Sequence, residues 1–163
     1  MTPFTLAEFS RLSPRLDRCD RELGQLSDFF DRHRSDVLAG DWGAVSAASL
    51  GVHNVYNGIE DILMSLARDL DGSAPTGPTL HQDILDQMAS ELAGRRPALL
   101  TPDLHIQLTE LKGFRHLVRH KYGFDLKPEK VVDNVERLQH AFPTFAKRLK
   151  DLHDQLAERS ASP

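Results

Sequence analysis

The chain has 163 residues, of which 40 % are hydrophobic and 27 % are charged, and its formal net charge is −4 at pH 7. These values are typical of a globular domain with its own core, and the acidic balance excludes proteins that coat nucleic acid or membranes with a broadly basic surface. The one cysteine, Cys19, excludes an internal disulfide, and its place in an apolar stripe predicts that it faces the core. Residues 1–10 lack a signal-peptide pattern and no stretch is long enough to span a membrane, so we expect a single cytoplasmic domain over residues 1–163.

Apolar residues at steps of three and four positions predict helices along the N-terminal half of the chain. The first stripe covers residues 6–30 and is interrupted at residues 13–14, where Ser-Pro indicates either a kink or an N-cap followed by a first-turn proline. A second stripe covers residues 52–70. Its helix is predicted to begin within residues 41–46 and to end at residues 71–72, where Asp-Gly is a common helix end.

Shorter elements are predicted after this second helix. Residues 72–78, rich in Gly and Pro, indicate a loop, and residues 80–92 indicate a short helix that is broken at residues 94–97. Thr101 is the expected N-cap of a longer helix that ends around residues 122–123.

The last helix is predicted to begin at residues 127–129 and to carry apolar residues as far as residue 152. Pro143 should bend or divide it, and residues 158–163 should form a frayed tail. No run alternates with period two for long enough to make a strand. The sequence therefore predicts an all-α bundle of about five helices, four of them long enough to form the core.

A basic segment covers residues 111–124. It holds four Lys or Arg residues, two His and one Tyr, and it lacks Asp and Glu although the chain is acidic overall. Arginine binds phosphoryl oxygens through a fork of donors, histidine exchanges protons near neutral pH, and tyrosine offers a hydroxyl. These residue types together favour chemistry at a phosphate group.

The spacing of this segment limits which side chains can meet. Arg115, Arg119 and Tyr122 share one helix face, whereas His116 and His120 form the neighbouring face. Arg115 and His120 are separated by about 140° around a straight helix. They can converge only if the helix ends near His120 or if a second copy of the chain faces the first.

Other interpretations of the basic segment stay open at this point. Cations near a helix C-terminus can simply complement the helix dipole, and Asp125 and Glu129 can pair with them in a surface network. His116 and His120 also have the spacing of a zinc pair, but two arginines and no carboxylate surround them, which argues against a metal.

The second long helix also carries a group of polar side chains: Asn54, Tyr56, Asn57 and Glu60. These side chains can satisfy one another at a contact between helices or subunits, or they can line the edge of a site. Gly58 lowers helix propensity and permits a close approach of another helix.

Four other side chains are given structural roles by the sequence. Trp42, beside a helix start, is expected to be a packing anchor. His33, His140 and His153 are expected to be solvated surface residues.

The segment from Arg115 to His120 matches the HEPN signature, which is an arginine, a polar residue, three arbitrary residues and a histidine. Here the polar position is His116. The motif continues to Tyr122 as a His-x-Tyr, which resembles the HepT branch of this family. Two other segments are also similar to members of that branch: residues 56–63 and the Arg-Pro turn at residues 96–97. The resemblance covers most of the chain between about residues 50 and 126.

This resemblance implies an antiparallel up-and-down four-helix core and a homodimer in which the two motif helices face a shared cleft. It also implies a metal-independent ribonuclease that needs no cofactor and acts as the toxin of a toxin–antitoxin pair. The antitoxin partner would be a minimal nucleotidyltransferase that adds AMP to Tyr122. RNA is the expected substrate, and neither DNA nor a membrane is an expected partner.

The resemblance also implies roles for the basic residues. His120 would remove the proton of a ribose 2′-OH, and Arg115, aided by Arg119, would hold the charge of the transition state that leads to a cyclic phosphate. His116 would make a polar contact or supply the leaving-group proton, and Lys121 would bind RNA phosphates. The alternative is a non-catalytic helical subunit that binds a nucleotide or a nucleotidyltransferase.

Overall fold

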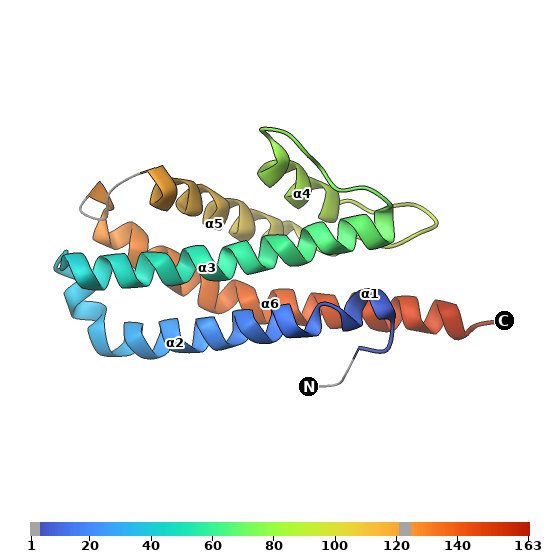
Figure 1. Ribbon diagram of the computed structural model, residues 1–163, viewed down its shortest axis with the longest axis horizontal. Helices are drawn as coiled ribbons and strands as arrows, with labels where there is room; N and C mark the ends of the chain where they lie inside the picture. Colours follow the sequence, from blue (N-terminus) through green and yellow to red (C-terminus); the bar gives the residue numbers. More distant parts are fainter. Residues whose placement is uncertain (1–3, 121–124) are drawn as a thin grey trace.

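The computed structural model describes residues 4–120 and 125–163. Four long helices dominate it: α2 (Ser13–Leu38), α3 (Trp42–Leu66), α5 (Pro102–His120) and α6 (Pro128–Ala161). They lie side by side and alternate in direction along the chain (Figure 1). Two short helices, α1 (Ala7–Ser10) and α4 (Leu80–Met88), complete the fold, and no strand occurs in residues 4–120 or 125–163. The all-α prediction with four long helices is therefore confirmed.

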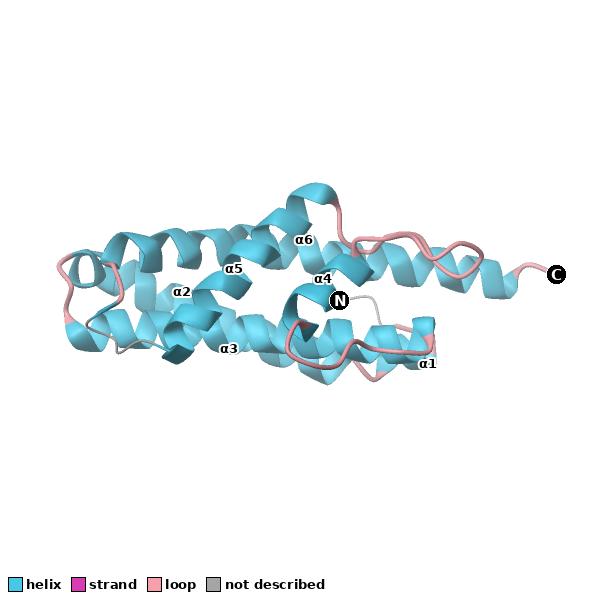
Figure 2. Ribbon diagram, turned by 90° about the horizontal axis from the view of Figure 1, so that it is seen from above, coloured by secondary structure: helices cyan, strands magenta, loops and turns pink. Residues whose placement is uncertain are grey.

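Helix α3 contacts each of the other long helices, because it packs against α2, α5 and α6. Helix α4 packs against α3 and α5, at one side of the four long helices (Figure 1). In the view from above, the loops lie at the ends of the long helices and around α4 (Figure 2). In the described part of the chain, no helix is long and apolar enough to cross a membrane.

Two glycines of α3 allow α2 to approach closely. A Cβ added to Gly51 would lie 2.8 Å from Cδ1 of Leu26, and a Cβ added to Gly58 would collide with Sγ of Cys19. The two glycines are seven residues apart on α3, and Cys19 and Leu26 are seven residues apart on α2. The two contacts therefore lie along one seam between the helices. Cys19 is buried in this seam, as predicted, and burial raises the pKa of its thiol to about 11.

The predicted ends of α3 and the predicted start of α5 are confirmed. Asp41 caps α3, because its Oδ2 accepts a hydrogen bond of 2.9 Å from a backbone N–H in the first turn. A π-helical turn, η1 (Ala67–Asp71), continues α3 to Gly72, whose φ of 83° ends it. Thr101 caps α5 through a hydrogen bond of 3.2 Å to its Oγ1.

The helices differ from the predicted ones in three details. Ser13 is the first residue of α2 and not its N-cap, so the Ser-Pro pair marks the boundary between α1 and α2 rather than a kink. Pro143 lies inside the single helix α6, so the predicted division of the helix is wrong; the buried neighbours Phe142 and Phe145 keep this turn against the core. The helix extends to Ala161, so the tail does not fray from residue 158.

The expectation for Trp42 is also wrong, whereas two predicted surface histidines are confirmed. Trp42 is 68 % exposed at the first position of α3, where the Asp41 cap and not the indole fixes the start of the helix. His140 is exposed and His33 is half-exposed.

His153 is not a surface residue, because it is only 5 % exposed. Its Nε2 accepts hydrogen bonds from the backbone N–H groups of Thr5 (3.0 Å) and Leu6 (3.3 Å). Its ring also packs against Phe4 and Phe9, with centroid distances of 5.2 and 5.3 Å. The N-terminal segment, which local periodicity cannot place, buries this histidine against α6.

A buried ion pair fastens the segment between α3 and α5. Arg96 donates to both carboxylate oxygens of Asp71, at 2.6 and 2.7 Å, and it also donates to the carbonyls of Gln87, Ser90 and Pro97. Burial alone would raise the pKa of the Asp71 carboxyl, but hydrogen bonds from Arg96 and Gln87 and the nearby positive charge hold it below its ordinary value. We call these contacts of Arg96 with Asp71 and the three carbonyls the clasp. The clasp links the end of α4 to the turn that ends α3.

Candidate functional site

The basic segment occupies the C-terminal half of α5, as predicted. Arg115 is half-buried, and its neighbours are exposed: His116, Arg119 and His120. The rings of His116 and His120 stack on each other, with centroids 4.2 Å apart and planes inclined by 29°. The two histidines therefore share a helix face, beside the face of Arg115.

Two predicted site residues, Lys121 and Tyr122, lie outside the described residues, as does the predicted end of this helix at residues 122–123. The described site therefore consists of the part of the basic segment that ends at His120 and of the residues that contact it.

Arg115 is held by an amide and not by a carboxylate. Its Nε donates to Oδ1 of Asn57 on α3. The amide nitrogen of Asn57 lies 3.3 Å from Nδ1 of His53, one turn away on the same helix. Within residues 4–120 and 125–163, no Asp or Glu forms an ion pair with Arg115, so its charge is oriented but not neutralised. Such an arginine is suited to bind an anion.

The second polar residue predicted on α3, Glu60, holds a histidine of α4. Glu60 is only 8 % exposed, and Nδ1 of His81 lies 2.8 and 2.9 Å from its two carboxylate oxygens. Asn57 and Glu60 therefore do not satisfy each other: each bonds to a different helix. Sequence reasoning missed His81 as a site residue, because its partner lies 21 positions away and no local pattern joins them.

The partners of both residues line one pocket of about 420 Å³ between α4 and α5. Its polar lining consists mainly of His81, Gln82, Lys112, Arg115 and His116. The Lys112 ammonium donates to Oε1 of Gln82 at 2.5 Å. Two cations and two imidazoles face a cavity of nucleotide-like size, which favours a phosphate-containing ligand.

Tyr56 lies behind this pocket on α3. Its hydroxyl is buried and has no hydrogen-bond partner among the residues that the structure describes. Burial, and next the Glu60 carboxylate, raise the pKa of Tyr56 well above its ordinary value, although the Arg115 charge opposes this. The neutral phenol of Tyr56 is therefore favoured over the phenolate.

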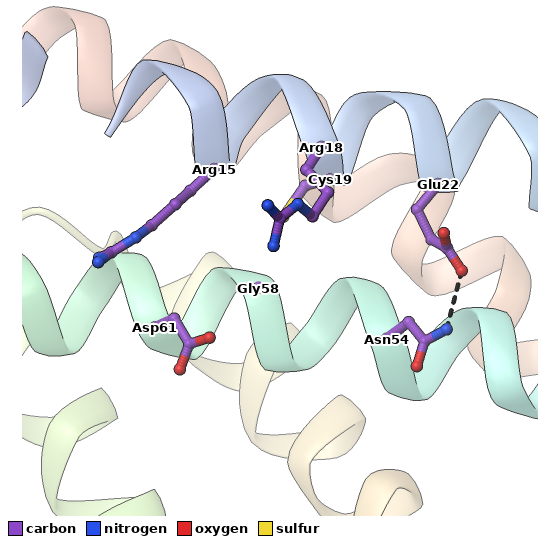
Figure 3. Close-up of a pocket in the computed structure, with 7 residues that line it drawn as sticks. All are labelled: Arg15, Arg18, Cys19, Glu22, Asn54, Gly58 and Asp61. Carbon is purple, nitrogen blue, oxygen red and sulfur yellow. Dashed lines mark hydrogen bonds between the residues drawn. The ribbon is translucent and has the colours of Figure 1, made fainter. Parts of the chain in front are cut away.

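Two other cavities have a mixed charge. The first, of about 240 Å³, lies between α2 and α3, where Arg15 and Arg18 face a groove that also holds Glu22 and Asp61 (Figure 3). In this groove Glu22 accepts a hydrogen bond of 2.9 Å from Asn54 (Figure 3). Because the lining holds as many carboxylates as arginines and no imidazole, this groove suits a phosphate less well.

The second, of about 500 Å³, lies between α5 and α6. Lys112, Lys130 and Arg137 line it together with Glu110 and Asp133. Carboxylates again offset part of the positive charge, so this cavity also suits a phosphate less well than the pocket that holds His81.

A bound metal finds no support in the geometry. In the described part of the chain, no three His, Cys, Asp or Glu side chains lie close enough to hold a metal ion. The stacked His116 and His120 have two arginines and no carboxylate among their neighbours in the sequence of α5.

The comparison with protein-family models gives a match. A family model described as HepT-like protein matches residues 47–156. This span includes most of α3, all of α4 and α5 and most of α6, and so it contains every side chain that lines the pocket between α4 and α5. The search of curated proteins and the search of solved structures found no significant match.

Proposed function

Because this chain belongs to the HepT-like protein family, we propose that it is a metal-independent endoribonuclease, the toxin of a HEPN–nucleotidyltransferase toxin–antitoxin pair. The observation that carries the proposal is the charge of Arg115, which no described carboxylate neutralises. This arginine shares a pocket with His116, whose ring stacks on that of His120. Arginine and histidine together supply what cleavage of RNA by its own 2′-OH requires.

In the proposed reaction His120 takes the proton of a ribose 2′-OH. The 2′-oxygen attacks the adjacent phosphorus, and the bond to the 5′-oxygen breaks with its electron pair on that oxygen. The 5′-oxygen takes a proton from a general acid, so the products are a 2′,3′-cyclic phosphate and a 5′-hydroxyl. The guanidinium of Arg115 holds the non-bridging oxygens as their charge grows. Arg119 and Lys121 bind neighbouring phosphates, and DNA, which lacks the 2′-OH, is not cut.

A second copy of the chain completes the site in this proposal. Arg115 is oriented toward α3 by Asn57, whereas His120 lies five positions further along an exposed face of α5. A homodimer that places two motif helices in a shared cleft brings the histidine of one chain to the arginine of its partner. In the cytoplasm, where we place the protein, a minimal nucleotidyltransferase would add AMP to Tyr122. This bulky anion would compete with RNA for these cations and prevent RNA from binding.

The test is cleavage of end-labelled RNA in EDTA by purified protein whose mass shows Tyr122 to be unmodified. Arg115→Ala and His120→Ala should abolish cleavage, because each removes a group that acts on the phosphate or the 2′-OH. His140→Ala, which changes an exposed histidine of α6 outside the pocket, should leave it unchanged. The wild-type products should end in cyclic phosphate.

The second candidate function is a non-catalytic subunit that binds a nucleotide in the same pocket. The size of this pocket and its two cations, Lys112 and Arg115, favour nucleotide binding whether or not RNA is cut. Tight nucleotide binding by protein that leaves RNA intact would favour this function over the ribonuclease.

A further inference from the structure

Resting on the proposed ribonuclease function, we propose that His81, held by Glu60, is a second proton-transfer residue of the site. It donates a proton to the 5′-oxygen that leaves the phosphorus, and the pocket between α4 and α5 receives the scissile phosphate and the leaving side of the RNA. This role goes to His81 rather than to His116.

The contact with Glu60 fixes the tautomer of His81. A carboxylate only accepts hydrogen bonds, so Nδ1 of His81, at 2.8 and 2.9 Å from its oxygens, carries the proton. The other ring nitrogen, Nε2, is then the atom that gains and loses a proton. The His81 side chain is 35 % exposed and lines the pocket, whereas Glu60 is buried behind it. A buried carboxylate that orients a half-exposed imidazole is a common arrangement of acid–base catalysts.

The polar face of α3 places this imidazole beside the phosphate-binding arginine. Asn57 and Glu60 lie one helical turn apart, and they hold Arg115 and His81 respectively. Since both held side chains line the same pocket, a phosphate bound by the guanidinium lies in the cavity that the His81 ring faces. His116, in contrast, is exposed on α5 and stacks on another histidine, with no carboxylate to orient it among the described contacts.

Several charged groups surround His81. They are Glu60 from α3, Lys112, Arg115 and His116 from α5, and Asp83 on α4 itself. Asp83 is engaged by the Thr79 hydroxyl at 2.6 Å, and Lys112 by Gln82. Glu60 is therefore the carboxylate that contacts the ring directly, and the bound phosphate offsets the two cations.

The proposed step balances without a co-reactant. His120 accepts the 2′-OH proton as the new P–O bond forms. The bond between phosphorus and the 5′-oxygen breaks with its electron pair on that oxygen, which takes the proton from Nε2 of His81. The enzyme ends with His120 protonated and His81 neutral, and exchange with water restores both.

The test compares two RNA substrates under single-turnover conditions in EDTA. One is ordinary, and the other carries sulfur in place of the leaving 5′-oxygen, so that its leaving group departs as a thiolate and needs no proton. On ordinary RNA, His81→Ala should lower the rate about 10²–10⁴-fold, the usual contribution of a positioned acid. On the sulfur substrate most of this loss should disappear, whereas His120→Ala should stay slow on both.

The matched control is His105→Ala. His105 also pairs with a carboxylate, with its Nε2 2.8 Å from Asp86, but it does not line the pocket. Its loss should leave both rates near those of the wild type. Glu60→Gln, which keeps the shape of the partner, should slow ordinary RNA and spare the sulfur substrate. In His81→Ala the pH–rate profile should lose its decline on the alkaline side, where a general acid is deprotonated.

The outcomes separate this proposal from the one on which it rests. If the wild type cuts RNA and His81→Ala cuts as fast as His105→Ala, the role of His81 is overturned and the ribonuclease stands. Equal slowing of His81→Ala on both substrates, with Glu60→Gln unchanged, would also overturn it, since it would indicate a structural role. If unmodified wild-type protein cuts neither substrate, the proposed function fails and this assignment with it.

Discussion

The clasp between Arg96 and Asp71 should contribute a large part of the stability of the fold. Replacing Arg96 by Met keeps most of the side-chain volume but leaves the buried Asp71 carboxylate without its charged partner, although the Gln87 amide still donates to it. The carbonyls of Gln87, Ser90 and Pro97 also lose the hydrogen bonds that Arg96 donates. Removing one partner of a buried ion pair costs about 3–5 kcal/mol of unfolding free energy. For a chain of this length, that corresponds to a fall in Tm of about 6–20 °C.

The loss of unfolding free energy in Arg96→Met should be largest near neutral pH and smaller in acid. The pKa of Asp71 is lowered in the folded protein from the value of 3.8. A carboxyl with a depressed folded pKa contributes stability above its unfolded pKa and loses it as the pH falls through the folded value. The difference in unfolding free energy between the wild type and Arg96→Met should therefore be full near neutral pH and should shrink in strong acid.

Urea unfolding followed by circular dichroism, near neutral pH and again at about pH 3, measures both quantities. Arg95→Met is the matched control, because Arg95 is exposed and its one hydrogen bond, to the Asp71 carbonyl, can be replaced by water. It should cost less than about 1 kcal/mol. A loss of less than about 1 kcal/mol in Arg96→Met, or one that does not change with pH, would refute the reasoning.

Three further predictions test the packing and the site. Gly58→Ala should lower the unfolding free energy by about 1–3 kcal/mol in urea titrations, because the new methyl group meets the thiol of Cys19, whereas Gly24→Ala, with nothing within 4 Å, should stabilise or be neutral. Thiol-labelling kinetics should show Cys19 unreactive in the native protein near neutral pH and reactive after unfolding, because its pKa is raised to about 11. Asn57→Asp should lower RNA cleavage, measured at saturating protein, about tenfold or more by pairing with Arg115, without lowering Tm.

Local patterns predict the helices because helix formation depends on near neighbours. The steps of three and four between apolar residues place the four long helices, and single residues such as Asp41 and Gly72 set the limits of α3 and η1. The same logic fails for His153, whose burial depends on the N-terminal segment. It also fails for Trp42, because a position beside a helix start does not indicate which way the indole points.

The sequence predicts only part of the candidate site, because local patterns do not report contacts between distant segments. Arg115, His116 and His120 stand out because they are close together in the chain and free of acids. Their supporting contacts are distant: Asn57 lies 58 positions from Arg115, and the partner of Glu60 is on a helix that the motif does not include. Such contacts arise only when α3, α4 and α5 pack together.

The clasp and the pocket are therefore connected through α4. This helix carries His81 at its start, while at its other end the backbone carbonyl of Gln87 accepts from Arg96. Because the proposed role of His81 requires its ring to reach both Glu60 and the pocket, a loosened clasp should disturb its position before it unfolds the protein. Arg96→Met, studied well below its Tm, should then slow ordinary RNA more than the sulfur-substituted RNA, as His81→Ala does, although Arg96 does not line the pocket.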